Sequence, residues 1–170
     1  MNLSTRFHLS RLAAIVLAVS LVVSACTSIR LISAYDQQTD EALTALHDST
    51  DEFIAKLIAN AKTSKNAFKK HKNFYAETDM QLRRLEFRVG SIPDNRQTVR
   101  LVADIRASIL GEGKCTADGG SLRDLHCLPE NAAKGPSKVA LEISRRNVNQ
   151  TIRAALALEL AKKQGLEPKN

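Results

Sequence analysis

Apolar side chains between residues 29 and 89 recur at steps of three or four, the spacing that places them on one face of an α-helix. The apolar positions of this stripe are Ile29, Ile32, Leu43, Leu46, Phe53, Leu57, Ala61, Phe68, Tyr75, Leu82, Leu85 and Val89, and Thr39, Thr50, Ser64, His71 and Thr78 fill the remaining ones. Glycine and proline, which punctuate helices, are absent from Thr27 to Val89. The pattern predicts a long amphipathic helix over about residues 29–71, a kink or short turn, and a second helix to Val89.

Two short sequences could interrupt this region. Ser49-Thr50-Asp51-Glu52 has the form of a capping box at the start of a helix. Asn73 could cap a new helix that begins at Phe74. The helix could therefore break near residue 49 or near residue 73, and an unbroken rod over residues 29–89 is the third possibility.

The rest of the chain also has helical spacing. After the turn sequence Gly90-Ser91-Ile92-Pro93-Asp94, a helix is expected over about residues 95–110, with the apolar set Val99, Val102, Ala103, Ile105 and Ile109. Glycines and prolines mark residues 111–136 as a long loop, in which residues 121–125 could form one helical turn. A last helix should begin at Pro136 and Ser137, run to about Gln164 and end before Gly165. Its core candidates are Val139, Ile143, Val148, Ile152, Ala155, Leu156 and Leu160.

No segment alternates apolar and polar residues strongly enough to predict a strand. The expected fold is therefore all-α: an antiparallel helical bundle of three to five helices, with a long N-terminal amphipathic helix and one closed loop.

The N-terminus has the organisation of a secretory signal. Arg6, His8 and Arg11 precede an apolar run from Leu12 to Val23, with no acidic residue among them. This run is shorter than the roughly 20 apolar residues that a membrane-spanning helix needs. A cleaved signal is therefore favoured over a permanent transmembrane helix.

The sequence Val23-Ser24-Ala25-Cys26 resembles the lipobox of bacterial lipoproteins. The resemblance implies that residues 1–25 are removed as a signal peptide, and that Cys26 carries diacylglycerol on its sulfur and an acyl chain such as palmitate on its amino group. Residues 26–170 would then be a single helical domain, lipid-anchored on the periplasmic side of a bacterial membrane. In bacterial lipoproteins, an aspartate directly after the lipidated cysteine favours retention in the inner membrane. Thr27 stands at that position here, and the absence of an aspartate favours the outer membrane. An ordinary signal peptide with a coincidental cysteine is the alternative.

The chain has three cysteines, an odd number, and lipidation of one of them would leave two that can pair. With Cys26 acylated, Cys115 and Cys127 remain, and the oxidising periplasm favours a disulfide between them within the loop 111–136. The rival hypothesis is a metal or reactive thiol site made by Cys115, His126 and Cys127, but it lacks a fourth ligand at useful spacing. We therefore predict a disulfide, no metal site and no cofactor.

Charge is segregated along the predicted long helix of this basic chain, whose formal net charge is +7. Acidic residues come first and lysines follow, an order that complements the helix dipole. Lys62, Lys65, Lys69 and Lys72 would share one helical face, which could contact anionic lipid headgroups, lipopolysaccharide phosphates or an acidic protein. Nucleic acid is not an expected partner, because of the compartment and because no aromatic residues interleave with the lysines.

No catalytic motif is present in the sequence. It has no nucleophile elbow, phosphate-binding loop or paired histidine motif. His71 is expected to pack within the stripe and His126 to lie in solvent, and the arginines near residues 83–88 and 145–146 are expected on solvated helix faces.

These features predict a non-enzymatic, lipid-anchored cell-envelope protein of structural or interaction type, with the membrane and an envelope protein as partners. The alternative is a periplasmic binding module, or an inhibitor or immunity-type protein. It would contact an anionic partner through Lys62, Lys65, Lys69 and Lys72 or through the disulfide loop.

Overall fold

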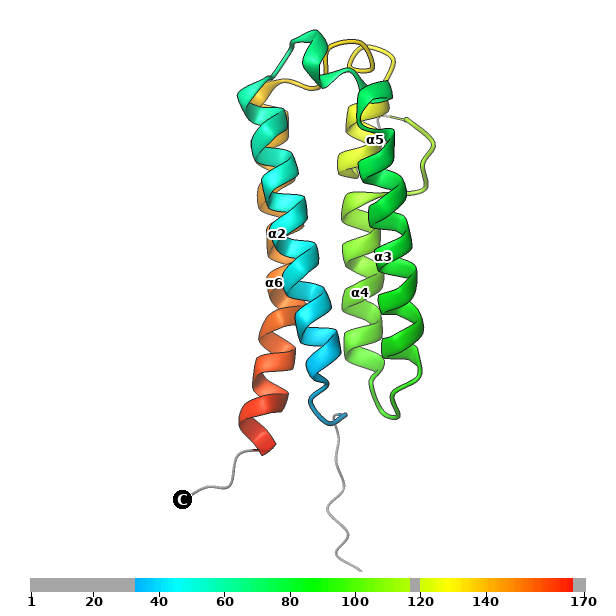
Figure 1. Ribbon diagram of the computed structural model, residues 1–170, viewed down its shortest axis with the longest axis vertical. Coiled ribbons are helices and arrows are strands. Elements are labelled where there is room, and N and C mark those ends of the chain that lie inside the picture. Colours follow the sequence, from blue (N-terminus) through cyan, green and yellow to red (C-terminus); the bar gives the residue numbers. More distant parts are fainter. Residues whose placement is uncertain (1–32, 117–119, 167–170) are drawn as a thin grey trace, which may run out of the picture. The chain divides into compact units, whose positions relative to one another are not determined.

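The computed structural model describes residues 33–116 and 120–166, and over these residues the chain is an all-α bundle (Figure 1). The long helices are α2 (Gln37–Ala59), α3 (Lys72–Gly90), α4 (Arg96–Ile109) and α6 (Lys138–Leu166), with a short α5 (Leu122–Cys127) and two 3₁₀ turns, η1 (Ser64–Asn66) and η2 (Phe68–Lys70). The predicted fold class is confirmed. Cys26, the signal residues 1–25, and Ile29 and Ile32 of the predicted stripe lie outside the described residues.

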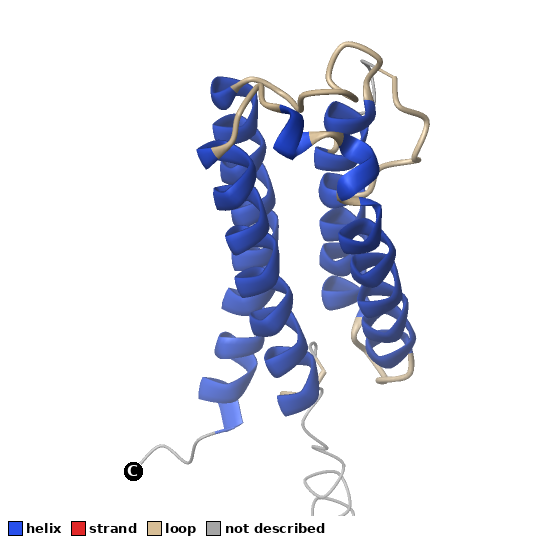
Figure 2. Ribbon diagram, turned by 45° about the horizontal axis from the view of Figure 1, so that its top comes forward, coloured by secondary structure: helices blue, strands red, loops and turns tan. Residues whose placement is uncertain are grey.

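Two antiparallel helix pairs make up the bundle. Helix α2 packs along α6, and α3 packs along α4, while α4 and α6 join the two pairs. Figure 2 shows the same arrangement turned, with the connecting segments gathered at the ends of the helices. Consecutive long helices run in opposite directions, so the segments that connect them alternate between the two ends of the bundle.

The two ends of the bundle differ in what they contain (Figure 1). Residues 33–37, 90–96 and 158–166 gather at one end, which we call the Ser33 end because the described chain begins there. Residues 60–71, α5 and residues 128–136 gather at the opposite end, which we call the lysine end. At about 1.5 Å per residue, the 23 residues of α2 separate the two ends by roughly 35 Å.

The core lies between the helix pairs and is aliphatic. Its fully buried large side chains include Leu43, Leu46, Ile54, Leu57, Leu82, Ile105, Ile109, Leu122, Leu141 and Ile152. Each such side chain contributes about 1.5–3 kcal/mol relative to an exposed one. Much of the predicted stripe is therefore core, and Thr39, Thr50 and Thr78 are buried within it, whereas Ser64 is exposed.

The first long helix starts later and ends earlier than predicted. The Asp36 carboxylate accepts a hydrogen bond from the backbone N–H of Thr39 (3.0 Å), so α2 begins at Gln37 and residues 33–36 are not helical. The capping-box sequence at residues 49–52 lies inside α2 without breaking it. The helix ends at Ala59, so the prediction of a helix to residue 71 is wrong, as is the unbroken rod. The second helix is close to its predicted position.

Polar side chains explain the break after Ala59. The Asn60 amide donates to the Lys56 carbonyl (2.9 Å), the Thr63 hydroxyl to the Asn60 carbonyl (2.8 Å), and the Asn66 amide to the Leu57 carbonyl (2.6 Å). These bonds satisfy carbonyls that a continuing helix would have used. The chain therefore leaves the helix and crosses the end of the bundle through η1 and η2.

Helices α4 and α6 lie close to their predicted ranges, but some predicted core residues are exposed. Val99 and Ala103 on α4, and Val139, Ile143 and Leu160 on α6, face solvent. The buried stripe of α6 instead includes Leu141, Ser144, Val148, Ile152, Ala155, Glu159 and Lys162. Gly165 lies within α6, which continues to Leu166.

Candidate functional site at the lysine end

Lysines cluster on the surface of the lysine end. The exposed ones are Lys62, Lys65, Lys69, Lys70, Lys72 and Lys134. The prediction that four of them share one helical face is wrong. Lys62 lies in a turn with a φ of 58°, Lys65 in η1, Lys69 in η2, and Lys72 is the first residue of α3. The fold nevertheless brings all four to the same end of the bundle.

An open pocket of about 600 Å³ lies among these lysines. Lys69, Lys70 and Lys72 line it together with the small or apolar side chains of Ser64, Ala67, Phe68, Ala132 and Ala133. The backbone N–H of Phe68 donates to the carbonyl of Ala132 (2.9 Å), which joins the two segments that line the pocket. The pocket therefore combines ammonium groups with a shallow apolar floor.

The clustered lysines are electrostatically uncompensated. Among the described residues, the lysines that pair with a carboxylate are Lys56, Lys114, Lys138 and Lys162, and none of these belongs to the cluster. Several arginines elsewhere pair within the fold: Arg88 pairs with Asp36, and Arg145 with Asp51. The lysine end thus keeps its positive charge for solvent or for a partner.

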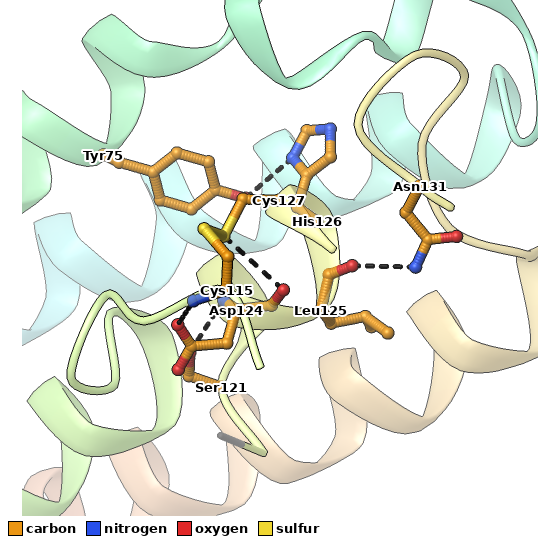
Figure 3. Close-up of a disulfide and its surroundings, with 8 residues drawn as sticks. All are labelled: Tyr75, Cys115, Ser121, Asp124, Leu125, His126, Cys127 and Asn131. Atoms are coloured by element: carbon orange, nitrogen blue, oxygen red, sulfur yellow. Dashed lines mark hydrogen bonds between the residues drawn. A yellow bond between two sulfur atoms is a disulfide. The ribbon is translucent and has the colours of Figure 1, made fainter. Parts of the chain in front are cut away.

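A buried histidine holds the lysine-bearing segment to the bundle. His126 on α5 has an exposed fraction of 0%, so the prediction that it lies in solvent is wrong. Its Nε2 lies 2.7 Å from the carbonyl oxygen of Asn66, and its Nδ1 lies 2.9 Å from the hydroxyl of Tyr75 on α3 (Figure 3). Because a carbonyl only accepts, Nε2 donates to Asn66 and Nδ1 accepts from Tyr75. The neutral imidazole is therefore fully satisfied.

Burial also sets the ionisation of this pair. Desolvation lowers the pKa of His126 below its usual 6.5, although the Asn66 carbonyl opposes that shift. Burial likewise raises the pKa of Tyr75 well above 10. The rings of Phe53, Phe68 and His71 lie within 6 Å of this pair, centroid to centroid, with His71 half-buried as predicted. The two groups therefore stay neutral near pH 7 and join η1 to α3.

Asn131 and Gly135 hold residues 128–136 against the segment of residues 60–71. The Asn131 amide donates to the carbonyl of Leu125 (2.8 Å), and the Lys62 ammonium donates to the Asn131 side-chain oxygen (3.1 Å). Gly135 has a φ of 74°, and a Cβ there would lie 2.6 Å from the Cβ of Asn66. Only glycine adopts this positive φ without strain and leaves room for the Asn66 side chain. Residues 128–136 therefore pack closely on the segment that carries the lysines.

The predicted disulfide is present beside this site (Figure 3). Cys115 and Cys127 are joined, with their Cα atoms 5.2 Å apart. Ser121 caps α5 by accepting from the Asp124 N–H (2.9 Å), and the Asp124 carboxylate accepts from the Cys115 N–H (3.2 Å). Both thiols are consumed, so the rival metal site of Cys115, His126 and Cys127 is wrong. No group of three His, Cys, Asp or Glu side chains suited to a metal occurs in the described residues.

A second polar cluster, which sequence reasoning missed, lies at the Ser33 end. The Lys162 ammonium donates to Glu159 (2.6 Å), Thr98 (2.7 Å) and Asn95 (2.8 Å), and the Ser33 hydroxyl donates to the same Asn95 oxygen (2.7 Å). Glu159 and Lys162 are both buried. This cluster joins the start of the described chain to α4 and α6.

None of the helices in the described part of the chain is long and apolar enough to span a membrane. No protein-family model, curated protein or solved structure matches the sequence or the fold.

Proposed function

We propose that this protein is a lipid-anchored interaction protein of the bacterial cell envelope, acylated at Cys26 and without catalytic activity. The observation that carries the proposal is that the two ends of the bundle differ. The described chain begins at Ser33, at one end of the bundle, and the uncompensated lysines lie at the opposite end. An anchor at one end and a charged surface at the other suit a protein that presents that surface away from its membrane.

The short chain between the anchor and the bundle supports this arrangement. Only residues 27–32 separate Cys26 from Ser33, and a segment of this length spans at most roughly 25 Å when extended. Two or more acyl chains give stable membrane attachment, whereas one gives marginal binding. The lysine end lies roughly 35 Å along the bundle from the Ser33 end.

Mass spectrometry of the protein purified from bacterial envelopes tests the anchor. The expected mature N-terminus is Cys26, with the added mass of diacylglycerol and of an N-acyl group. The variant Cys26→Ser should remain unprocessed and carry no acyl mass. A mature protein that begins elsewhere, or an unmodified Cys26, would refute the proposal.

A second candidate function is binding of an acidic protein through the lysine end, and the unpaired lysines favour it. Lys65 and Lys69 are suitable probes because their ammonium groups make no hydrogen bond or ion pair within the described residues, unlike that of Lys62. The double variant K65E/K69E should weaken binding to polyglutamate, used as an acidic protein mimic, by at least tenfold at low salt. R146E/R153E is the matched control, because it makes the same charge change at exposed positions on α6. Equal losses in the two variants would show a net-charge effect and reject the lysine end.

A further inference from the structure

We propose that the outer face of the α3–α4 pair, near the Ser33 end, lies on the surface of an anionic membrane. The residues of this face are Met80, Arg84, Phe87, Arg96, Val99 and Arg100. The inference rests on the proposed acylation at Cys26 and adds to it a defined orientation of the bundle on the lipid. Its partner is a lipid surface that carries negative headgroups.

The first observation is the exposure of large apolar side chains on these two helices. Phe87 has an exposed fraction of 81%, the highest among the exposed large hydrophobic residues, and Met80 and Val99 are also exposed. Met80 and Phe87 are seven residues apart on α3 and therefore lie on one side of it. Aromatic and aliphatic side chains on a basic face are typical of surfaces that lie in the membrane interface.

Val99 lies beside the line of contact between α3 and α4, which we call the seam. Arg106 of α4 donates to Glu86 of α3 (2.7 Å), so both residues face the contact between the two helices. Val99 lies two turns from Arg106 on α4, on the same side and closer to the Ser33 end. Phe87 follows Glu86 and points about 100° further around α3, away from the buried residues of that helix and toward its outer side. The exposed apolar residues of the two helices therefore border one seam.

The second observation is uncompensated positive charge on this face. Arg84, Arg96 and Arg100 are exposed, and none has a carboxylate partner among the described residues, where Asp79 and Glu86 are already occupied by Arg83 and Arg106. Glu77, Asp94 and Asp104 are the exposed acids closest to it in sequence. A basic side chain near an anionic membrane contributes roughly a fivefold factor in binding.

The third observation is how the chain that follows Cys26 is fixed to the bundle. Ser33 donates to Asn95, the residue before α4, and Asp36 accepts two hydrogen bonds from Arg88, the neighbour of Phe87 (2.7 and 2.5 Å). The segment that leads to the anchor is therefore attached beside Phe87 and Arg96. An acyl chain on Cys26 would hold this part of the bundle closest to the lipid.

Single tryptophans test the orientation, since the sequence contains none. The full acylated protein is placed in vesicles of phosphatidylethanolamine and phosphatidylglycerol that carry brominated acyl chains. Phe87→Trp reports on the proposed face. Leu160→Trp is a matched control at the same end, because Leu160 is 54% exposed and lies three turns from Asn149, on the α6 side that faces α2. Val139→Trp, 65% exposed, reports on the lysine end.

The expected result is a blue-shifted emission and several-fold stronger bromine quenching for F87W than for L160W or V139W. Adding R96E/R100E to F87W, or omitting phosphatidylglycerol, should reduce that quenching several-fold while the protein stays acylated. Equal quenching of the three tryptophans, or a blue shift of F87W that depends on protein concentration without lipid, would overturn the proposal. The latter result would indicate a second copy on this face. Mass spectrometry of the same samples separates the two hypotheses, because absent acyl mass refutes the anchor and unquenched F87W in acylated protein refutes only the orientation.

Discussion

His126 shows how much of this site is decided by single residues. Its neighbours in the sequence, a cysteine within a long loop, suggest an exposed side chain. The structure buries it because Tyr75 and Asn66, which are 51 and 60 residues away in the chain, bond to its two nitrogens. A separation of this kind leaves no local signal, so the sequence could supply the disulfide beside His126 but not the role of the histidine.

Protonation of His126 should destabilise the fold. Its folded-state pKa lies below 6.5, so the unfolded chain takes up a proton first as the pH falls. The free energy of unfolding should therefore be fully retained above about pH 7 and should decrease as the pH drops below about 6.5. Urea denaturation between pH 8 and pH 5 measures this slope. His126→Gln should lower overall stability and flatten the slope. A slope unchanged in His126→Gln would contradict the assignment.

Gly135 provides a second test at a single residue. Gly135→Ala must place a Cβ 2.6 Å from that of Asn66 and hold a φ of 74°, so it should cost about 2–3 kcal/mol. Gly120→Ala is the control, because Gly120 has a φ of 63° but no atom of the described residues within 4 Å of its Cβ position, and only the backbone cost of about 1 kcal/mol applies. Chemical denaturation compares the two variants. Equal costs would mean that Asn66 moves aside and that the close packing is unimportant.

At the scale of elements, the existence of the helices follows from the sequence more reliably than their ends and faces do. The stripe over residues 29–89 continues in register through residues 60–71, so the spacing alone suggests helix there. The break was signalled by another feature, the cluster Asn60, Thr63, Ser64 and Asn66, whose polar side chains compete for backbone carbonyls. On α6, the buried stripe passes through Glu159 and Lys162. Charged residues are rarely buried, so the sequence pattern favours Leu160 as a core residue, whereas the structure exposes it.

The disulfide should be the main support of the loop that carries α5. It joins cysteines 12 residues apart, and closing a loop of this size contributes about 3 kcal/mol in the chain-entropy model. The double variant Cys115→Ser/Cys127→Ser should lose about that much stability in urea denaturation. Hydrogen exchange of the α5 amides should rise more than that of the α2 amides, because the disulfide tethers α5 directly. A loss below about 1 kcal/mol would show that Ser121 and Asp124 hold the loop without it.

Ion pairs that join distant segments organise the whole molecule. Arg145 on α6 lowers the pKa of Asp51 on α2 to about 2, and Arg88 on α3 lowers the pKa of Asp36 to about 2. These partners are 94 and 52 residues apart, so the sequence showed arginines on helix faces without showing what they contact. The arginine pairs fasten the bundle together, whereas the clustered lysines, the arginines on the outer face of α3 and α4, and Arg146 and Arg153 on α6 have no carboxylate partner among the described residues. Charge composition alone could not separate the paired cations from the unpaired ones.

Removing one member of the buried Glu159–Lys162 pair should lower the free energy of unfolding strongly, whereas replacing both members should change it little. Lys162→Met leaves the Glu159 carboxylate buried without its cation, and one of its oxygens already lacks a hydrogen-bond partner among the described residues. Removing one partner of a buried ion pair costs about 3–5 kcal/mol, whereas replacing both by apolar residues is often close to neutral.

We therefore expect Lys162→Met to lose about 3–5 kcal/mol of stability, and Glu159→Leu/Lys162→Met to regain most of it. A double-mutant cycle by chemical denaturation measures the coupling. If the double variant is as unstable as the single one, the pair is held by its hydrogen bonds to Thr98 and Asn95 rather than by charge compensation. In that case the pair serves to fix the Ser33 end, where the described chain begins beside α4.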